Sequence, residues 1–148
     1  MSTPSAADLQ RDAAAQPELT ERAAARALVS YVDLVNAGLR GEGVAELADA
    51  TDPQCSCYAL VELIEEGTDA GGEFVDAEFT ASDVTVRSTD GATAVVRAHV
   101  DVSAYQVKSP DGLILDSTPA DSYVADYTLR TDGEQATVVA VEPVRPAA

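Results

Sequence analysis

Apolar residues recur at helical spacing in the first half of this chain and alternate with polar residues in the second half. Across residues 17–40 the positions at helical spacing are apolar: Ala24, Leu28, Val32, Val35 and Leu39. This spacing predicts an amphipathic helix of about six turns, with Pro17 in its first turn and Gly41 at its end. Such a helix needs an apolar surface against which to pack.

Two shorter helices are expected after it. Residues 44–50 have Val44 and Leu47 on one side, and Pro53 ends the turn that follows. A third helix is expected over about residues 55–66, with Val61 facing the core and Gly67 as its terminator.

From residue 73 onward the apolar period changes to two, which is typical of strands with one buried face. Extended segments are predicted over residues 74–80, 82–88, 92–108, 113–115, 122–131 and 135–144. Asp90-Gly91 and Asp132-Gly133 are strong hairpin signals, and residues 109–112 have the composition of a turn. Helices that precede hairpin-linked strands indicate an α+β fold with an antiparallel sheet.

The predicted organisation is a single α+β domain over residues 17–145, preceded by a flexible tail or linker over residues 1–16. At 148 residues the chain is long enough for one domain with its own core. We expect the strands to form one curled sheet whose apolar side is covered by the helix at residues 17–40.

The charge balance bears on the partners. The chain has 26 acidic and 9 basic residues, a formal net charge of −17. Nucleic-acid binding depends on clustered Lys and Arg, so no nucleic-acid partner is expected, nor electrostatic docking on an anionic membrane. No apolar run reaches the roughly 18 residues that a transmembrane helix needs, and residues 1–16 lack a signal core. The chain is therefore expected to be cytoplasmic, or to be the soluble part of a protein whose signal segment lies upstream.

Two cysteines, Cys55 and Cys57, lie one residue apart. They are a disulfide, half of a metal site or two free thiols. A metal site needs about four ligands, and the one histidine, His99, is far along the chain, so neither a metal nor another cofactor is expected. Residues two apart on a helix point about 200° apart, so a Cys55–Cys57 bond requires a turn. His99 is either a general base or a polar residue at the surface or at a pocket rim.

Two motifs carry a family resemblance. The run from Ala27 to Ala37 (ALVSYVDLVNA), and the stretch from Leu47 through Asp52-Pro53-Gln54-Cys55-Ser56-Cys57, resemble a family of uncharacterised actinobacterial envelope proteins, many of them lipoproteins. The arrangement of helices and strands resembles the nuclear transport factor 2-like, or SnoaL-like, cone. In this chain the cysteines are separated by one residue where the family has two, and residues 1–54 contain no cysteine that could carry a lipid anchor.

The resemblance implies a curved sheet around the first helix, with a pocket at its mouth. Enzymes with the cone fold place a Tyr, Asp or His in that pocket for proton transfer. The pocket candidates by residue type are Tyr31, Asp33, His99, Tyr105, Tyr123 and Tyr127. No spacing singles out a catalytic pair among them, so no catalytic residue is assigned.

The function expected from the resemblance is a non-catalytic cell-envelope domain that binds a protein partner or a small ligand. Its cysteines would be oxidised in an extracytoplasmic location, where the domain would be membrane-anchored or secreted. The alternative is a small SnoaL-like isomerase, hydratase or cyclase with its site at the sheet mouth, and a third option is a cytoplasmic homodimer. A pocket that holds an isolated carboxyl beside Tyr or His would favour the enzyme, and an apolar interior would favour the binding domain.

Overall fold

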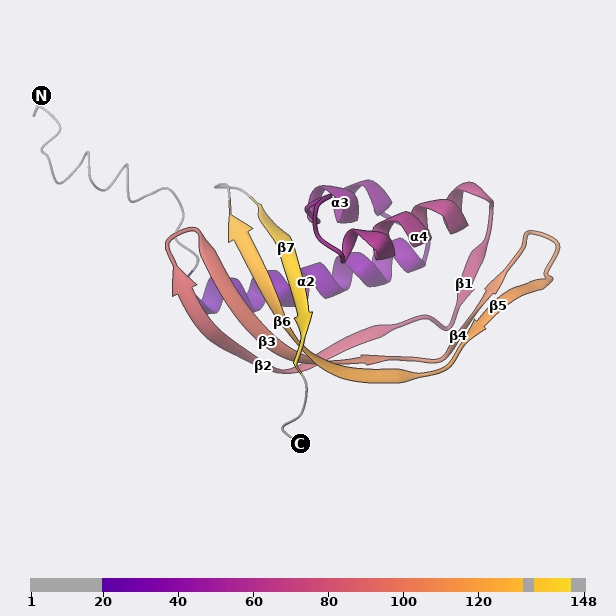
Figure 1. Cartoon of the computed structure of the whole chain (residues 1–148). Coiled ribbons are helices and arrows are strands. Elements are labelled where there is room, and N and C mark those ends of the chain that lie inside the picture. Colours follow the sequence, from indigo (N-terminus) through magenta and orange to yellow (C-terminus); the bar gives the residue numbers. More distant parts are fainter. Residues whose placement is uncertain (1–19, 132–134, 145–148) are drawn as a thin grey trace, which may run out of the picture.

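In the part of the chain that the structure describes, three helices lie on the concave side of strongly bent antiparallel strands (Figure 1). The computed structural model describes residues 20–131 and 135–144. The expected tail at residues 1–16, Pro17 and the Asp132-Gly133 hairpin lie outside the described residues. The predicted α+β class with helices against antiparallel strands is confirmed.

Helix α2 (Glu21–Leu39) is the long amphipathic helix that the apolar spacing predicts. It begins at a different residue from the expected one, because Thr20 is the N-cap and its side chain accepts a hydrogen bond from Ala23 N at 3.1 Å. Gly41, with φ +80°, ends the helix as expected. The edge formed by Leu28, Val32 and Val35 is buried.

Helix α3 (Val44–Asp49) matches its prediction, but helix α4 (Tyr58–Asp69) differs from the expected 55–66 at both ends. It begins three residues later because Cys55 and Cys57 are bonded to each other in a turn. Gly67 does not terminate it. This glycine lies inside α4 against the ring of Phe74, where a Cβ would be 2.6 Å from the ring carbon Cζ. Gly71, with φ +73°, follows the end of the helix instead.

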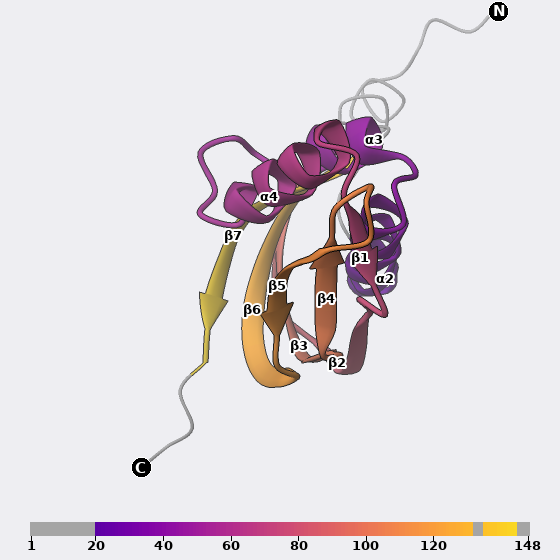
Figure 2. The ribbon, with the colours of Figure 1, turned by 90° about the vertical axis from the view of Figure 1, so that its right-hand side faces the viewer.

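The described strands form two antiparallel sheets. One has the order β2-β3-β6-β7, and its strands are Phe79–Asp90, Thr93–Val102, Asp121–Thr131 and Ala136–Pro143. The other has the order β1-β4-β5, and its strands are Glu73–Val75, Tyr105–Lys108 and Ile114–Thr118. Figure 2 shows β4 and β5 continuing the course of β3 and β6 around the bend.

The division between the sheets corrects the prediction of one continuous sheet and of one strand over residues 92–108. At the bend, Ser103 Oγ accepts a hydrogen bond from Glu78 N at 2.9 Å and donates to the carbonyl of Asp76. Asp76 has a φ of +65°, which interrupts the extended backbone between β1 and β2. The alternation slips here, so that Ala104 is exposed while Tyr105 is half-buried.

The core lies between α2 and the concave face of the four-stranded sheet. The inward positions of β3 are fully buried at Ala94, Val96, Ala98 and Val100, as the alternation predicts. Asn36 of α2 bonds the edge of β2 twice, accepting from Phe79 N at 2.7 Å and donating to Phe79 O at 2.9 Å. The helix is thereby fixed to the sheet along the wall of the pocket described next.

Candidate functional site

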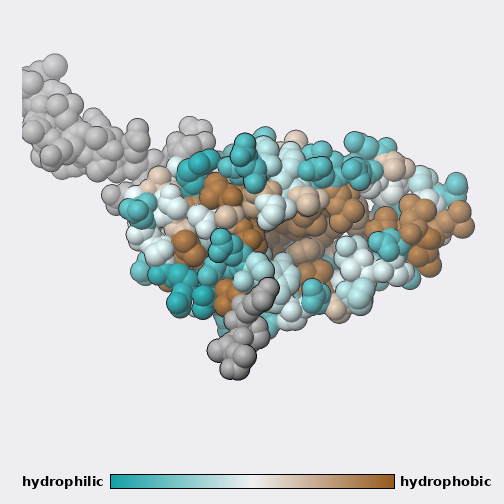
Figure 3. Space-filling view, viewed as in Figure 1, coloured by the Kyte–Doolittle hydropathy of each residue, from teal (hydrophilic) through white to brown (hydrophobic). Residues whose placement is uncertain are grey.

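A cavity of about 340 Å³ opens between α2, the start of α4 and the inner face of β6 and β7. Figure 3 shows it as a brown-lined hollow beneath the helices. We call it the tyrosine pocket, and its lining residues are Tyr31, Val32, Val35, Ser56, Cys57, Leu60, Phe79, Tyr123, Ala125, Tyr127, Val141 and Pro143. The cavity is therefore walled mainly by aliphatic and aromatic side chains.

Three tyrosines supply most of the polar groups of this pocket. Tyr31 comes from α2, whereas Tyr123 and Tyr127 lie on the same face of β6. The rings of Tyr31 and Tyr127 are tilted by 59° with their centroids 6.5 Å apart. Behind them the hydroxyl of buried Thr51 lies 3.2 Å from the Tyr31 hydroxyl and donates to the carbonyl of Leu47 at 2.8 Å. These contacts fix the position of the Tyr31 side chain.

Burial makes the tyrosines poor proton acceptors. It raises the pKa of Tyr31 above its ordinary value. The pKa of Tyr127 is raised by burial first, and then by neighbouring Tyr123 and Tyr31. Both phenols therefore stay neutral at physiological pH, where they donate and accept hydrogen bonds. No Asp, Glu, His, Lys or Arg is among the described residues that line the pocket.

The structure brings together three of the six pocket candidates and separates the others. Asp33 is exposed on α2. Tyr105 lies in the three-stranded sheet, where its ring packs against that of Phe74 at 6.3 Å. His99 lies on the polar side of β3, since its chain neighbours Ala98 and Val100 point into the core.

His99 belongs to an exposed cluster with Ser122 and Asp101. His99 Nε2 is 2.6 Å from Ser122 Oγ and 3.3 Å from Asp101 Oδ1, and Ser122 donates to Asp101 at 2.8 Å. A nucleophilic triad uses one imidazole nitrogen for the serine and the other for the carboxylate. Here a single nitrogen faces both partners, so the cluster lacks the geometry of a proton relay.

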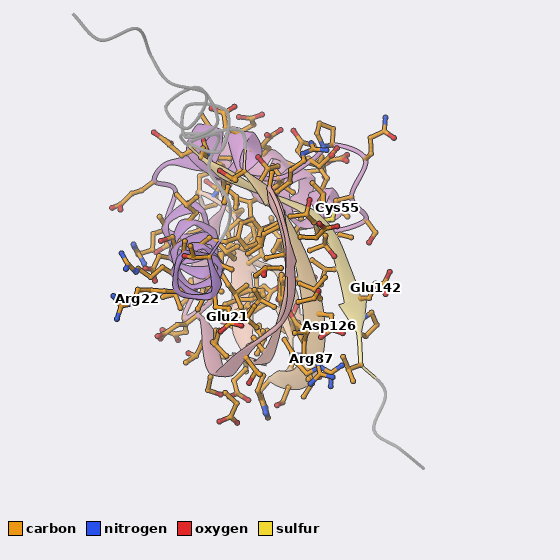
Figure 4. The ribbon with its side chains drawn as sticks, turned by 90° about the vertical axis from the view of Figure 1, so that its left-hand side faces the viewer. Glu21, Arg22, Cys55, Arg87, Asp126 and Glu142 are labelled. Atoms are coloured by element: carbon orange, nitrogen blue, oxygen red, sulfur yellow. A yellow bond between two sulfur atoms is a disulfide. The ribbon has the colours of Figure 1, made fainter. Side chains whose placement is uncertain are left out.

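An ion pair crosses β3 and β6 on the same outer side. Arg97 Nε and Nη2 donate to the two carboxylate oxygens of Asp126 at 2.8 and 3.1 Å. These hydrogen bonds hold the pKa of Asp126 below its ordinary value, and the charge of Arg87 adds to the effect. Figure 4 shows Arg87 beside Asp126 on this face. The pair is part-buried and joins two strands, which indicates a structural role.

The cysteines form a disulfide in the turn before α4 (Figure 4), with a sulfur–sulfur distance of 1.95 Å. The turn that such a bond requires is present, since Cys55 N donates to Asp52 O at 2.9 Å and Tyr58 N donates to Cys55 O at 3.0 Å. Cys55 is buried, whereas Cys57 is half-buried and lines the tyrosine pocket.

Several lining residues were not anticipated from the sequence, notably Cys57, Leu60, Phe79 and Val141. Leu60 lies beside core residues Val61 and Ile64 in the helical spacing, a signal that could have indicated it. Val141 lines the pocket because β7 extends far enough along the sheet to reach it, and the local sequence pattern does not predict the length of β7.

Within residues 20–131 and 135–144, no group of three or more His, Cys, Asp or Glu residues is placed to hold a metal ion. Among the helices of the same segments, none is long and apolar enough to cross a membrane.

No protein-family model and no curated protein matches this sequence. Solved structures do match it. The intermembrane space region of the chloroplast protein ARC6 has a TM-score of 0.63 at 13% identity, covering 88% of this chain and 100% of that one. An NTF2-like protein with a cystatin-like fold from Novosphingobium aromaticivorans has a TM-score of 0.50 at 15% identity, covering 96% and 90%.

The beta subunit of the benzoate 1,2-dioxygenase from Burkholderia mallei also matches, with a TM-score of 0.50 at 13% identity, covering 97% of this chain and 92% of that one. At these identities the likeness concerns the fold alone. The chain has the cystatin-like, nuclear transport factor 2-like (NTF2-like) fold.

Proposed function

We propose that this chain is a binding module that holds a small, uncharged, largely apolar ligand in the tyrosine pocket and performs no reaction on it. The observation that carries the proposal is the lining of the pocket, in which apolar walls meet neutral tyrosine hydroxyls. Pockets of this composition bind by burying apolar ligand surface, and a few placed polar groups fix the orientation.

The size and charge of the protein narrow the ligand class. A cavity of about 340 Å³ is at the small end of the roughly 300–1,000 Å³ range of ligand pockets. A net charge of −17 disfavours anions, and a cation would have no carboxylate to meet among the described lining residues. A neutral ligand with a hydroxyl or carbonyl facing Tyr31 and Tyr127 fits best.

The lining supports binding over the isomerase, hydratase or cyclase alternative. Proton transfer at neutral pH works best with a group whose pKa lies near the operating pH. The pKa values of the buried tyrosines move away from that range. His99 and its partners Ser122 and Asp101 do not line the pocket, since His99 lies on the face of β3 that points away from the core.

We further place this module in the cell envelope, outside the cytoplasm. The Cys55–Cys57 disulfide supports this location, because disulfides persist mainly in oxidising compartments. The resemblance of residues 27–37 and 47–57 to actinobacterial envelope lipoproteins supports it too. The location is tested by lysing the protein's own host under denaturing conditions with an alkylating agent present. Alkylated cysteines are then counted by mass spectrometry, since each one marks a thiol that was reactive at lysis. Fewer than one reactive thiol per chain is expected, and two would contradict it.

Titration with the neutral dye Nile red tests the binding function. The wild-type chain should bind it saturably, with a rise in fluorescence. Leu60→Trp should weaken binding by about tenfold or more, equivalent to ~1.4 kcal/mol. Leu60 lines the pocket, and the larger tryptophan side chain would occupy part of the space that the ligand needs. The matched control is Leu63→Trp on the exposed side of the same helix, where Leu63 is 45% exposed.

The control variant should bind like the wild type. Since the natural chain contains no tryptophan, the indole at position 60 also reports directly on the pocket, and its emission should shift when dye binds. Absence of saturable binding, or equal loss in both variants, would overturn the proposed function.

A further inference from the structure

The chain has a strong helix-start signal six residues before α4 begins. Asp52 is a favoured N-cap residue and Pro53 a favoured first helical residue. Asp52 Oδ1 already accepts a hydrogen bond from Gln54 N at 2.8 Å, as an N-cap side chain does for the second helical residue. Yet α4 begins at Tyr58. The backbone of Cys57, with φ −65° and ψ −16°, is helical as well.

The disulfide accounts for the discrepancy. Successive helical residues are rotated by about 100°, so side chains two apart point about 200° apart and cannot be bonded. The Cys55–Cys57 bond is therefore incompatible with a helix that runs through both residues. The segment forms four-residue turns instead, in which Cys55 N donates to Asp52 O and Tyr58 N to Cys55 O.

We infer that this disulfide is a redox switch on the wall of the tyrosine pocket. When it is reduced, α4 extends toward its N-terminus as far as Pro53. The extension reshapes the wall because Ser56, Cys57 and Leu60 form part of the lining. As a means of regulating the ligand site, the inference rests on the proposed function. The structural change itself does not.

The extended helix would separate the two cysteines. Cys55 would fall four residues before Ala59, which is exposed, as is Glu62 one turn further on. Cys57 would fall four residues before buried Val61 and three before Leu60 of the pocket. Cys55 is now 6% exposed, so reduction should turn its thiol out to solvent, while Cys57 stays on the pocket side.

The reductant required is a dithiol. Its thiolate attacks the sulfur of Cys57, the less buried of the two, and the bond to Cys55 breaks with Cys55 as the leaving thiolate, which takes up a proton. The second thiol of the reductant then displaces Cys57 and closes the reductant's own disulfide. Two electrons and two protons pass to the protein in total.

The structural part is tested by NMR and by alkylation of the full chain, native and reduced with dithiothreitol. The Cα chemical shifts of residues 54–57 should move to helical values on reduction. Limiting iodoacetamide, followed by mass spectrometry, should modify Cys55 before Cys57. Unchanged shifts, or faster modification of Cys57, would overturn the inference. A Cys55→Ser/Cys57→Ser variant should show the helical shifts with or without dithiothreitol.

The functional part is tested by Nile red binding to the same samples. Reduction should weaken binding by about threefold or more, because the extended helix moves part of the lining out of the arrangement that holds the ligand, and only the fraction of molecules that returns to that arrangement can bind. If the oxidised protein does not bind the dye, the proposed function fails, while the switch is still judged by the shifts and the alkylation order. If both forms bind equally, the regulatory inference fails and the proposed function stands.

Discussion

The two sheets of this protein differ in what covers their apolar residues. In the four-stranded sheet the inward residues of β3 and β6 are buried beneath α2, which contacts β2, β3 and β6. In the three-stranded sheet the residues at the β4–β5 hairpin are open to solvent, with Leu113, Ile114 and Leu115 exposed by 65%, 56% and 63%. Apolar residues in a strand are therefore not buried by their pattern alone, and the covering element decides whether they are.

Helix length explains the difference. Nineteen residues of α2 span about 28 Å at 1.5 Å per residue, enough to follow the four-stranded sheet. Among the described residues, α4 reaches the three-stranded sheet near its C-terminal end, where Gly67 lies against the Phe74 ring and Gly71 lies against Pro110 of the β4–β5 hairpin. The three-stranded sheet should therefore depend on a few contacts, of which the buried Phe74 ring is the largest, whereas the four-stranded sheet depends on a distributed core.

The largest effect is expected from Leu28→Ala in the covered region. Leu28 is fully buried on α2, so truncation should lower the free energy of unfolding by about 2–5 kcal/mol. The matched variant Leu115→Ala removes the same atoms from the exposed hairpin and should change it by less than about 0.5 kcal/mol. Urea titrations of both variants measure the difference. Similar losses would mean that the hairpin is covered in solution.

Phe74→Ala should affect the two sheets unequally. Removal of this buried ring should cost about 3 kcal/mol and should detach the three-stranded sheet first, because Phe74 is the buried side chain by which β1 packs against α4. Amide exchange should accelerate in β1, β4 and β5 under conditions where β3 and β6 stay protected. Uniform acceleration across both sheets would show that they unfold as one unit.

Part of this architecture could be predicted from the sequence. The face of α2 at Leu28, Val32 and Val35 and the alternation of β3 each depend on local periodicity, so both were predictable. The bend at Ser103 was not, because it depends on hydrogen bonds to Asp76 and Glu78, about 25 residues earlier in the chain. The sequence near Ser103 continues to alternate and gives no sign of it.

The pocket was predictable by residue type and less so by position. Tyr31, Tyr123 and Tyr127 meet because helix and strand periodicity place each on an inward face. Asp33 was separated from them by its place on the exposed side of α2. The predicted start of α4 was wrong because the helical periodicity of residues 55–66 includes both cysteines. A regular helix cannot run through two residues that are joined by this disulfide.

A smaller loss of stability is expected on the outer face of the four-stranded sheet. There the Arg97–Asp126 ion pair joins β3 and β6, and the side chains are not packed in the core. Asp126→Asn should lower the free energy of unfolding at pH 7 by about 1 kcal/mol or less. The pKa of Asp126 is lowered in the fold by the hydrogen bonds from Arg97. The contribution of Asp126 to the free energy of unfolding is therefore present at pH values above its ordinary pKa of about 4. It is lost as the pH falls through the lower pKa that Asp126 has in the folded protein.

The difference between wild type and Asp126→Asn should accordingly shrink in urea titrations repeated at about pH 3. Asp33→Asn, a change of the same type at an exposed position, serves as the control and should be neutral at both pH values. If the loss in free energy of unfolding caused by Asp126→Asn were as large at about pH 3 as at pH 7, it would come from a change in packing and not from the lost charge.

The smallest effect is expected where the three-stranded sheet is most open. Leu113→Ser/Leu115→Ser should leave the free energy of unfolding within about 1 kcal/mol of the wild type, because side chains already in water lose little on truncation. The same variant should elute earlier from a hydrophobic interaction column, since an apolar patch is removed. A clear loss of stability, with a smaller sedimentation coefficient, would instead mean that the hairpin is buried against a second copy of the chain. The contrast between the two sheets would then be a property of the isolated subunit.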